Sequence, residues 1–108
     1  MPFPCWDKVI HNTKKVSLLF GNYSTLPIIA TRGCPYSVFK YCVYPLQQGR
    51  KVRQRSPKKI VDEMEYWKNK MNIGMFVFRD PVFSINRNHT IEFAKELISR
   101  KLNLKFII

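Results

Sequence analysis

The feature that most constrains this chain is an alternation of short apolar runs with longer amphipathic stretches. Apolar runs occupy residues 28–30, 75–78 and 104–108, each too short to form a helix by itself. Two stretches with apolar residues at helical spacing lie between these runs. The order strand, helix, strand, helix, strand predicts an α/β fold, in which a β-α-β-α-β unit forms a parallel sheet. We expect residues 1–27 to be an N-terminal arm and residues 28–108 to form the domain.

The first helix has a clear start. Ser56 can cap free amide groups, and Pro57 suits the first helical position, where a missing N–H needs no partner. Its apolar face is predicted to hold Ile60, Val61, Met64, Trp67 and Met71. Gly74 follows the end of this helix and precedes the strand at 75–78, where Pro81 then forces an exit from the sheet.

The second helix is predicted between a cap at Asn86 or Asn88 and an end near Asn103. Its inner face is predicted to hold Ile91, Ala94, Leu97 and Ile98. The long segment from Cys34 to Arg55 contains two prolines and a glycine, so we expect it to be a loop without regular structure.

The charge distribution points to an anionic partner. The chain carries a net charge of +12, and eleven Lys and Arg residues lie between Asp7 and Asp62 without a single carboxylate among them. Nucleic acid, a phosphate-bearing ligand and an acidic protein surface all fit this pattern, as does a solvated basic face with no ligand. No apolar run is long enough to span a bilayer, and the start does not read as a signal peptide, so a cytoplasmic location is expected.

The chain has three cysteines, Cys5, Cys34 and Cys42. An odd number without framework spacing indicates free thiols or metal ligands rather than disulfides. Cys5 by itself is read as a small buried apolar residue.

Residues 31–57, TRGCPYSVFKYCVYPLQQGRKVRQRSP, closely resemble the cluster loop of radical S-adenosylmethionine (radical SAM) proteins. The most similar branch carries an upstream cobalamin-binding domain and includes methyltransferases and oxidative cyclases. The likeness continues through VDEMEYW and FVFRDPVF to the second helix and the last strand, and PFPCWD resembles the linker before the barrel.

The resemblance implies the first part of a partial (β/α) barrel with chemistry at the carboxyl ends of its strands. Members of the family bind a 4Fe–4S cluster through three thiolates of a CxxxCxxC loop. The cluster holds S-adenosylmethionine and cleaves it reductively to a 5′-deoxyadenosyl radical. Cobalamin is not expected in this chain, because an arm of 27 residues cannot contain its domain.

The chain departs from this motif in the middle. Cys34 matches the first ligand and Cys42 the last, which makes them the candidate metal ligands. Val38 and Phe39 stand where one cysteine would, and neither can bind iron. Read this way, the chain is a truncated relative with a degenerate motif, impaired or inactive alone, in which Cys5, His11 or His89 could supply a third ligand only on chemical grounds.

Three further positions are candidate cofactor-binding residues by resemblance. Tyr41 matches the aromatic residue before the last cysteine, near the adenine. Asp80 follows the second strand, where the family holds the methionine amino group, and a carboxylate can accept from an ammonium. Arg50, like Arg53 and Arg55, could bind the cofactor carboxylate or an anionic substrate.

Two other functions remain open. The basic span 40–59, with Phe39, Tyr41 and Tyr44 for stacking, could form a non-enzymatic nucleic-acid-binding module. Three parallel strands also leave open sheet edges, so a second chain or self-association could cover them in a protein-interaction module.

Overall fold

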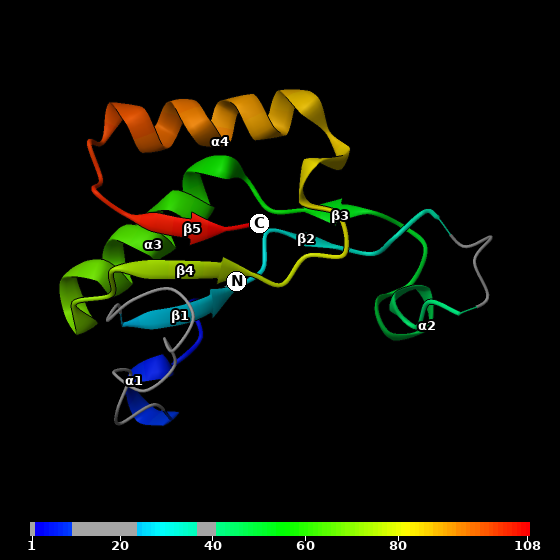
Figure 1. Cartoon of the computed structure of the whole chain (residues 1–108), viewed down its shortest axis with the longest axis horizontal. Coiled ribbons are helices and arrows are strands. Elements are labelled where there is room, and N and C mark those ends of the chain that lie inside the picture. The colour runs from blue at the N-terminus through cyan, green and yellow to red at the C-terminus, as the bar shows by residue number, and fades with distance from the viewer. Residues whose placement is uncertain (1, 10–23, 37–40) are drawn as a thin grey trace.

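A computed structural model describes residues 2–9, 24–36 and 41–108, and Figure 1 shows their arrangement. The helices and strands alternate through most of this range. In chain order they are α1 (Trp6–Val9), β1 (Thr25–Ile28), β2 (Thr31–Arg32), α2 (Tyr44–Gln48), β3 (Arg53–Gln54), α3 (Pro57–Met71), β4 (Met75–Phe78), the 3-10 turn η2 (Phe83–Ile85), α4 (Arg87–Ser99) and β5 (Lys105–Ile107).

The predicted α/β fold with a parallel sheet is confirmed. The main sheet has the order β1-β4-β5, and both neighbouring pairs run parallel. Each strand is added on the same side of the previous one, with α3 and then α4 as the connections, which is consistent with a partial β/α fold. None of the described helices has the length and apolar character needed to cross a membrane.

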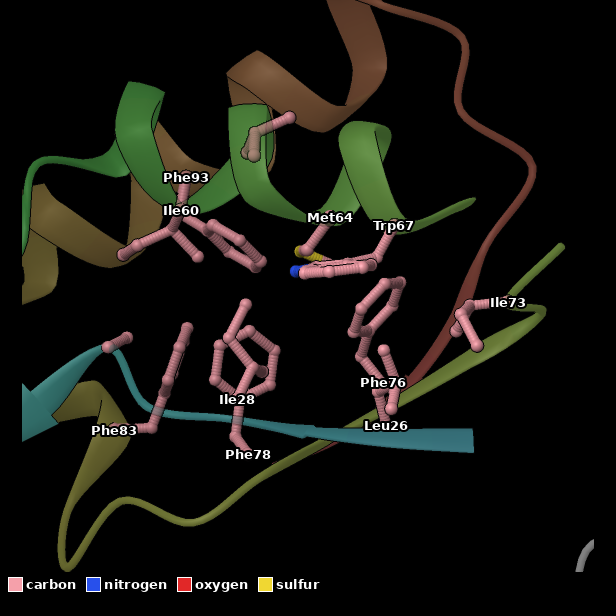
Figure 2. Close-up of a cluster of buried hydrophobic side chains, with 12 residues drawn as sticks. Leu26, Ile28, Ile60, Met64, Trp67, Ile73, Phe76, Phe78, Phe83 and Phe93 are labelled. Carbon is pink, nitrogen blue, oxygen red and sulfur yellow. The ribbon is translucent and has the colours of Figure 1, made fainter. Parts of the chain in front are cut away.

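Side-chain alternation on the strands directs one face of the sheet to the helices. Leu26 and Ile28 of β1, and Phe76 and Phe78 of β4, are buried, whereas the residues between them are only partly covered. Figure 2 shows these strand side chains meeting those of α3 in one apolar cluster. The buried residues contributed by α3 are Ile60, Val61, Glu63, Met64 and Trp67.

Four phenylalanines extend this core towards α4 and β5. Phe78 packs edge-on against Phe83 at 4.7 Å and against Phe93 at 5.5 Å between ring centroids. Phe106 of β5 approaches Phe93 at 5.9 Å, also edge-on. These tilted contacts suit the charge distribution of aromatic rings, so the cluster ties η2, α4 and both strands together.

The first strand begins earlier than the sequence predicted, at Thr25 instead of Ile28. Pro27 is tolerated because β1 is an edge strand, where a missing backbone N–H breaks no ladder hydrogen bond. The strand therefore crosses the expected boundary between arm and domain, while the division into arm and domain itself stays a prediction. In the arm, Asp7 of α1 forms a salt bridge with Lys70 of α3, and Trp6 packs against the core.

The expectation of an irregular segment from Cys34 to Arg55 is wrong in two places. Pro45 occupies the first turn of the short helix α2, a position that accepts proline. β3 then pairs antiparallel with β2, so that Thr31 faces Gln54 and Arg32 faces Arg53. The segment thus leaves the main sheet and returns as β3 to complete a separate two-stranded sheet with β2, which we call the β2–β3 hairpin.

The two helix starts differ in their capping. Asn86 caps α4 as predicted, because its side-chain Oδ1 accepts from the backbone N–H of His89 at 3.2 Å. Ser56 occupies the cap position of α3, but its side chain makes no capping hydrogen bond, which leaves Pro57 as the residue that favours this start.

The predicted inner face of α4 is wrong for three of its four residues. Ile91, Ala94 and Ile98 are exposed, Leu97 is half-buried, and His89 and Phe93 are the buried residues. Both sets recur at helical spacing, so periodicity alone could not choose between them. The aromatic cluster around Phe93 and a hydrogen bond of His89 decide the rotation of the helix.

We predict that Ile60→Ala lowers the free energy of unfolding by about 2–5 kcal/mol, because Ile60 is fully buried between α3 and the sheet. Ile98→Ala is the matched control, since Ile98 is 75% exposed, and its effect should stay within about 0.5 kcal/mol. Urea unfolding followed by circular dichroism measures both. Equal losses for the two variants would contradict this placement of the core.

Candidate functional site

The carboxyl ends of β1 and β4, together with the β2–β3 hairpin, gather most of the buried polar groups of the described residues. In Figure 1 the hairpin lies beyond these strand ends, with α2 further out. Backbone groups at the end of a strand lack a ladder partner and need other donors and acceptors. Thr31, Glu63 and His89 are buried here with the aid of hydrogen bonds.

Arg55 connects four elements at this place. Its backbone N–H donates to the carbonyl oxygen of Ala30 at 2.9 Å, and its Nη1 donates to that of Ile29 at 2.9 Å. Its Nη2 forms a salt bridge with Oε2 of Glu63, whose side chain is 3% exposed. A carboxylate buried to this degree requires a paired cation, so Arg55 has a structural role here. The cofactor contact that the sequence suggested for Arg55 stays a prediction.

His89 and Asp80 complete the arrangement. His89 Nε2 lies 2.7 Å from the carbonyl oxygen of Arg55, and because a carbonyl only accepts, this nitrogen carries the proton. Asp80 Oδ1 accepts from the backbone N–H of Ala30 at 2.8 Å and so joins the end of β4 to the end of β1. Asp80 Oδ2 and His89 Nδ1 are both buried without a hydrogen-bond partner among the described residues.

Burial raises the pKa of the Asp80 carboxyl above its ordinary value of 3.8, because the charged form loses solvation. The Ala30 N–H, the backbone N–H and hydroxyl of Thr31 and, less strongly, the nearby His89 oppose this rise in the pKa. Asp80 Oδ2 therefore offers an acceptor position that a cationic donor would stabilise. This position is compatible with the predicted contact to an amino group, which stays a prediction.

The cysteine loop is anchored through its backbone. Gly33 has φ +90°, and a Cβ placed on it would lie 2.1 Å from the carbonyl oxygen of Lys51. Only glycine permits this close crossing of the two chain segments. Cys34 then donates its backbone N–H to the carbonyl oxygen of Gly49 at 3.1 Å, and Gln48 Oε1 accepts from Gly33.

The two candidate metal ligands lie in different surroundings. Cys34 is 6% exposed and Cys42 is half-buried, whereas Cys5 is exposed and does not take the buried role expected for it. Within residues 2–9, 24–36 and 41–108, no three His, Cys, Asp or Glu side chains form a group that could hold a metal ion. Val38, Phe39 and His11 lie outside these residues.

These donors do not fit the cluster of the family. A site-differentiated 4Fe–4S cluster needs three thiolates in one loop, and this loop contains two. Neither Val38 nor Phe39 has a donor atom in its side chain, whatever its position.

The remaining candidates lie on the surface. Tyr41 is 84% exposed, and Arg50 is exposed as well. Arg53 donates from Nη2 to the carbonyl oxygen of Gln48 at 2.8 Å, which fixes it to the end of α2. Exposed Tyr41 and Tyr44 near exposed basic residues leave the nucleic-acid alternative as a prediction.

Sequence reasoning missed two residues of this region. No role was assigned to Glu63 from the sequence. A carboxylate between the buried apolar residues Val61 and Met64 could have indicated an internal ion pair. His89 was considered only as a chemical alternative for iron, and its hydrogen bond to the Arg55 carbonyl depends on a contact between segments far apart in the chain.

Comparison with known proteins gives three similar chains. Two are anaerobic magnesium-protoporphyrin IX monomethyl ester cyclases, from Cereibacter sphaeroides, with 41% identity over 90% of this chain, and from Rubrivivax gelatinosus, with 33% identity over 92%. An uncharacterised methyltransferase of Pyrococcus horikoshii is 23% identical over 98% of this chain. The similarity to the cyclases supports the radical SAM superfamily and no narrower group.

The chain spans 14%, 16% and 22% of the length of these three relatives, respectively. No model of a protein family matches it.

We predict that Gly33→Ala destabilises the fold far more than Gly49→Ala. Both glycines have positive φ, so each substitution introduces about 1–3 kcal/mol of backbone strain. At Gly49 a Cβ meets no atom within 4 Å, whereas at Gly33 it collides with the Lys51 carbonyl. Urea unfolding of the two variants compares them directly, and equal destabilisation would contradict the crossing at Gly33.

A second prediction concerns pH. A carboxyl whose pKa is raised by folding stabilises the folded state below its ordinary pKa, and this contribution is lost as the pH rises through the raised value. Asp80→Asn retains the acceptor for the Ala30 N–H but cannot ionise. The free energy of unfolding of the variant, relative to the natural chain, should therefore increase as the pH rises above about 3.8. Urea titrations from pH 3 to 8 (roughly the range of carboxyl ionisation) test this, and a pH-independent difference would refute it.

Proposed function

We propose that the chain is the first part of a radical SAM-type barrel, in which the family chemistry is impaired because the central cluster cysteine is replaced. That chemistry is the reductive cleavage of S-adenosylmethionine to a 5′-deoxyadenosyl radical. The observation that carries the proposal is the place of the degenerate cysteine loop, which follows β1 of a parallel sheet and the short strand β2. In addition, 90% of this chain aligns with a cyclase at 41% identity.

The proposed cofactor site has two parts, the iron ligands and the residues that would contact S-adenosylmethionine. Cys34 and Cys42 are the proposed remaining iron ligands, and two thiolates of one loop are too few for the family's cluster. Asp80 is the proposed acceptor for the amino group of S-adenosylmethionine, since Oδ2 is buried and lacks a partner among the described residues. Tyr41 and Arg50 are proposed to contact the adenine and the carboxylate of the same molecule.

A partner that covers the open sheet edge is also part of the proposal. Exposed apolar side chains gather on α4 and β5: Ile91 is 40% exposed, Ile98 75%, Phe106 40% and Ile108 63%. Such residues on a helix and on an edge strand are typical of a surface that another element covers. A second polypeptide or a second copy of this chain, in the cytoplasm, would fit.

Anaerobic reconstitution with iron and sulfide tests the proposal. The natural chain is expected to retain well below the roughly four irons of a complete cluster and to form no 5′-deoxyadenosine on reduction. Val38→Cys with Phe39 deleted restores the CxxxCxxC spacing and should raise both the iron content and the charge-transfer absorbance. Val38→Ala with Phe39 deleted is the matched control, because it has the same loop length without the thiol.

Two outcomes would contradict the proposal. One is a natural chain that binds a complete cluster and cleaves S-adenosylmethionine. The other is equal iron binding by the cysteine variant and its alanine control, since iron would then be held independently of the motif.

A further inference from the structure

A cavity of about 470 Å³ lies beside the open edge of β1, between the arm and the β2–β3 hairpin. Trp6 of the arm and Ile29 after β1 contribute to an apolar wall. Arg32, Arg53 and Arg79 contribute cationic groups from the hairpin and from the residue that follows β4. We call this space the arm cavity. Its volume is that of a site for a small organic molecule.

The charge of the arm cavity is not balanced by the protein. Four arginines and one carboxylate, Glu63, line it, and Arg55 already forms a salt bridge with Glu63. The guanidinium groups of Arg32 and Arg79 make no hydrogen bond or salt bridge within the described residues, and Arg53 donates only to a backbone carbonyl.

Carboxylates elsewhere in the chain are engaged or distant. Asp7 pairs with Lys70, and Arg100 binds three others: Asp62, Glu65 and Glu96. Asp80 accepts from the Ala30 N–H, and Glu92 is exposed on α4. The residues that the structure does not describe contain no Asp or Glu. None of these carboxylates lines the arm cavity, and none forms a salt bridge with Arg32, Arg53 or Arg79 among the described residues.

The arm supplies a further unused donor. Trp6 lines the arm cavity, and its indole Nε1–H is buried without an acceptor among the described residues. This group can only donate, and a buried donor without an acceptor costs free energy. An oxygen-rich anion in the cavity would supply acceptors to the arginines, and the apolar part of the Trp6 ring would contact its body.

We propose that the arm cavity binds an organic oxyanion, a carboxylate or a phosphate monoester, with a compact apolar body. Arg32, Arg53 and Arg79 would hold the anionic group, for which the planar guanidinium is well suited. The apolar body would lie against Trp6 and Ile29. Neither Cys34 nor Cys42 lines the cavity, so this inference goes beyond the proposed function and does not depend on it.

Isothermal titration calorimetry on the full chain tests the proposal, without iron or reductant. The probes are 1-naphthoate, 1-naphthyl phosphate, the neutral 1-naphthalenemethanol and inorganic phosphate. One of the two naphthyl anions should bind with one-to-one stoichiometry and at least about tenfold more tightly than the neutral alcohol and than inorganic phosphate. The reason is that a naphthyl anion contacts both the apolar wall and the arginines, whereas the alcohol lacks the charge and inorganic phosphate lacks the apolar body. The tighter of the two identifies the anionic group that the site prefers.

Variants locate the binding. Arg32→Gln combined with Arg79→Gln should weaken binding of the preferred anion by about tenfold or more, and Trp6→Ala, which removes the aromatic wall, should weaken it by a few-fold (about two to ten). Arg87→Gln is a charge control: it removes one cationic group from the start of α4, outside the cavity, and should leave affinity nearly unchanged. Circular dichroism confirms folding, and single Arg53→Gln replaces the double variant if that one unfolds.

Three results would overturn the proposal. They are the absence of binding by either naphthyl anion, equal binding of the neutral alcohol, and equal weakening by Arg87→Gln. Failure here leaves the iron experiment untouched, and failure of the iron experiment leaves this one untouched, because the two share no reagent and no variant.

Discussion

The salt bridge between Arg55 and Glu63 is the interaction on which the carboxyl ends of the strands depend. Glu63 lies on the buried face of α3, where an unpaired carboxylate would be strongly unfavourable. Arg55 compensates this charge from the segment that precedes α3, and the same residue binds the carbonyl groups of Ile29 and Ala30 and accepts from His89. Through its ion pair with Glu63 and its own backbone groups, Arg55 thus connects the end of β1 and the end of β3 to α3 and α4.

This arrangement separates two kinds of stabilisation. The middles of the strands are held by apolar packing against α3, which tolerates small changes of shape. Their ends are held by directional hydrogen bonds, which do not. Residues that follow the strands, such as Gly33 and Asp80, consequently have defined positions even though they belong to connecting segments.

Local patterns predicted most of the fold, and contacts between distant segments decided the rest. α3 starts after Ser56 and β4 spans 75–78 as predicted, because apolar spacing and a proline determine each of them locally. The rotation of α4 could not be predicted, since Phe93 is selected by aromatic partners on other elements. The hairpin of β2 and β3 was missed because two-residue strands carry no periodicity.

The same distinction applies to the sites. The cysteines were visible as a spaced motif, and their roles remain predictions; the arm cavity has no motif, because its arginines come from three separate places in the chain.

The described contacts that hold Cys34 do not involve its sulfur atom. Among the described residues, the hydrogen bonds and close contacts that position this loop are those of the Cys34 N–H with the Gly49 carbonyl, of the Gly33 N–H with Gln48 Oε1, and the crossing at Gly33. None of them uses a sulfur atom, so replacing a thiolate removes a metal ligand without removing a structural bond. The contacts of the parallel sheet, of Asp80 with the Ala30 N–H and of the crossing at Gly33 therefore hold without any contribution from a cysteine sulfur.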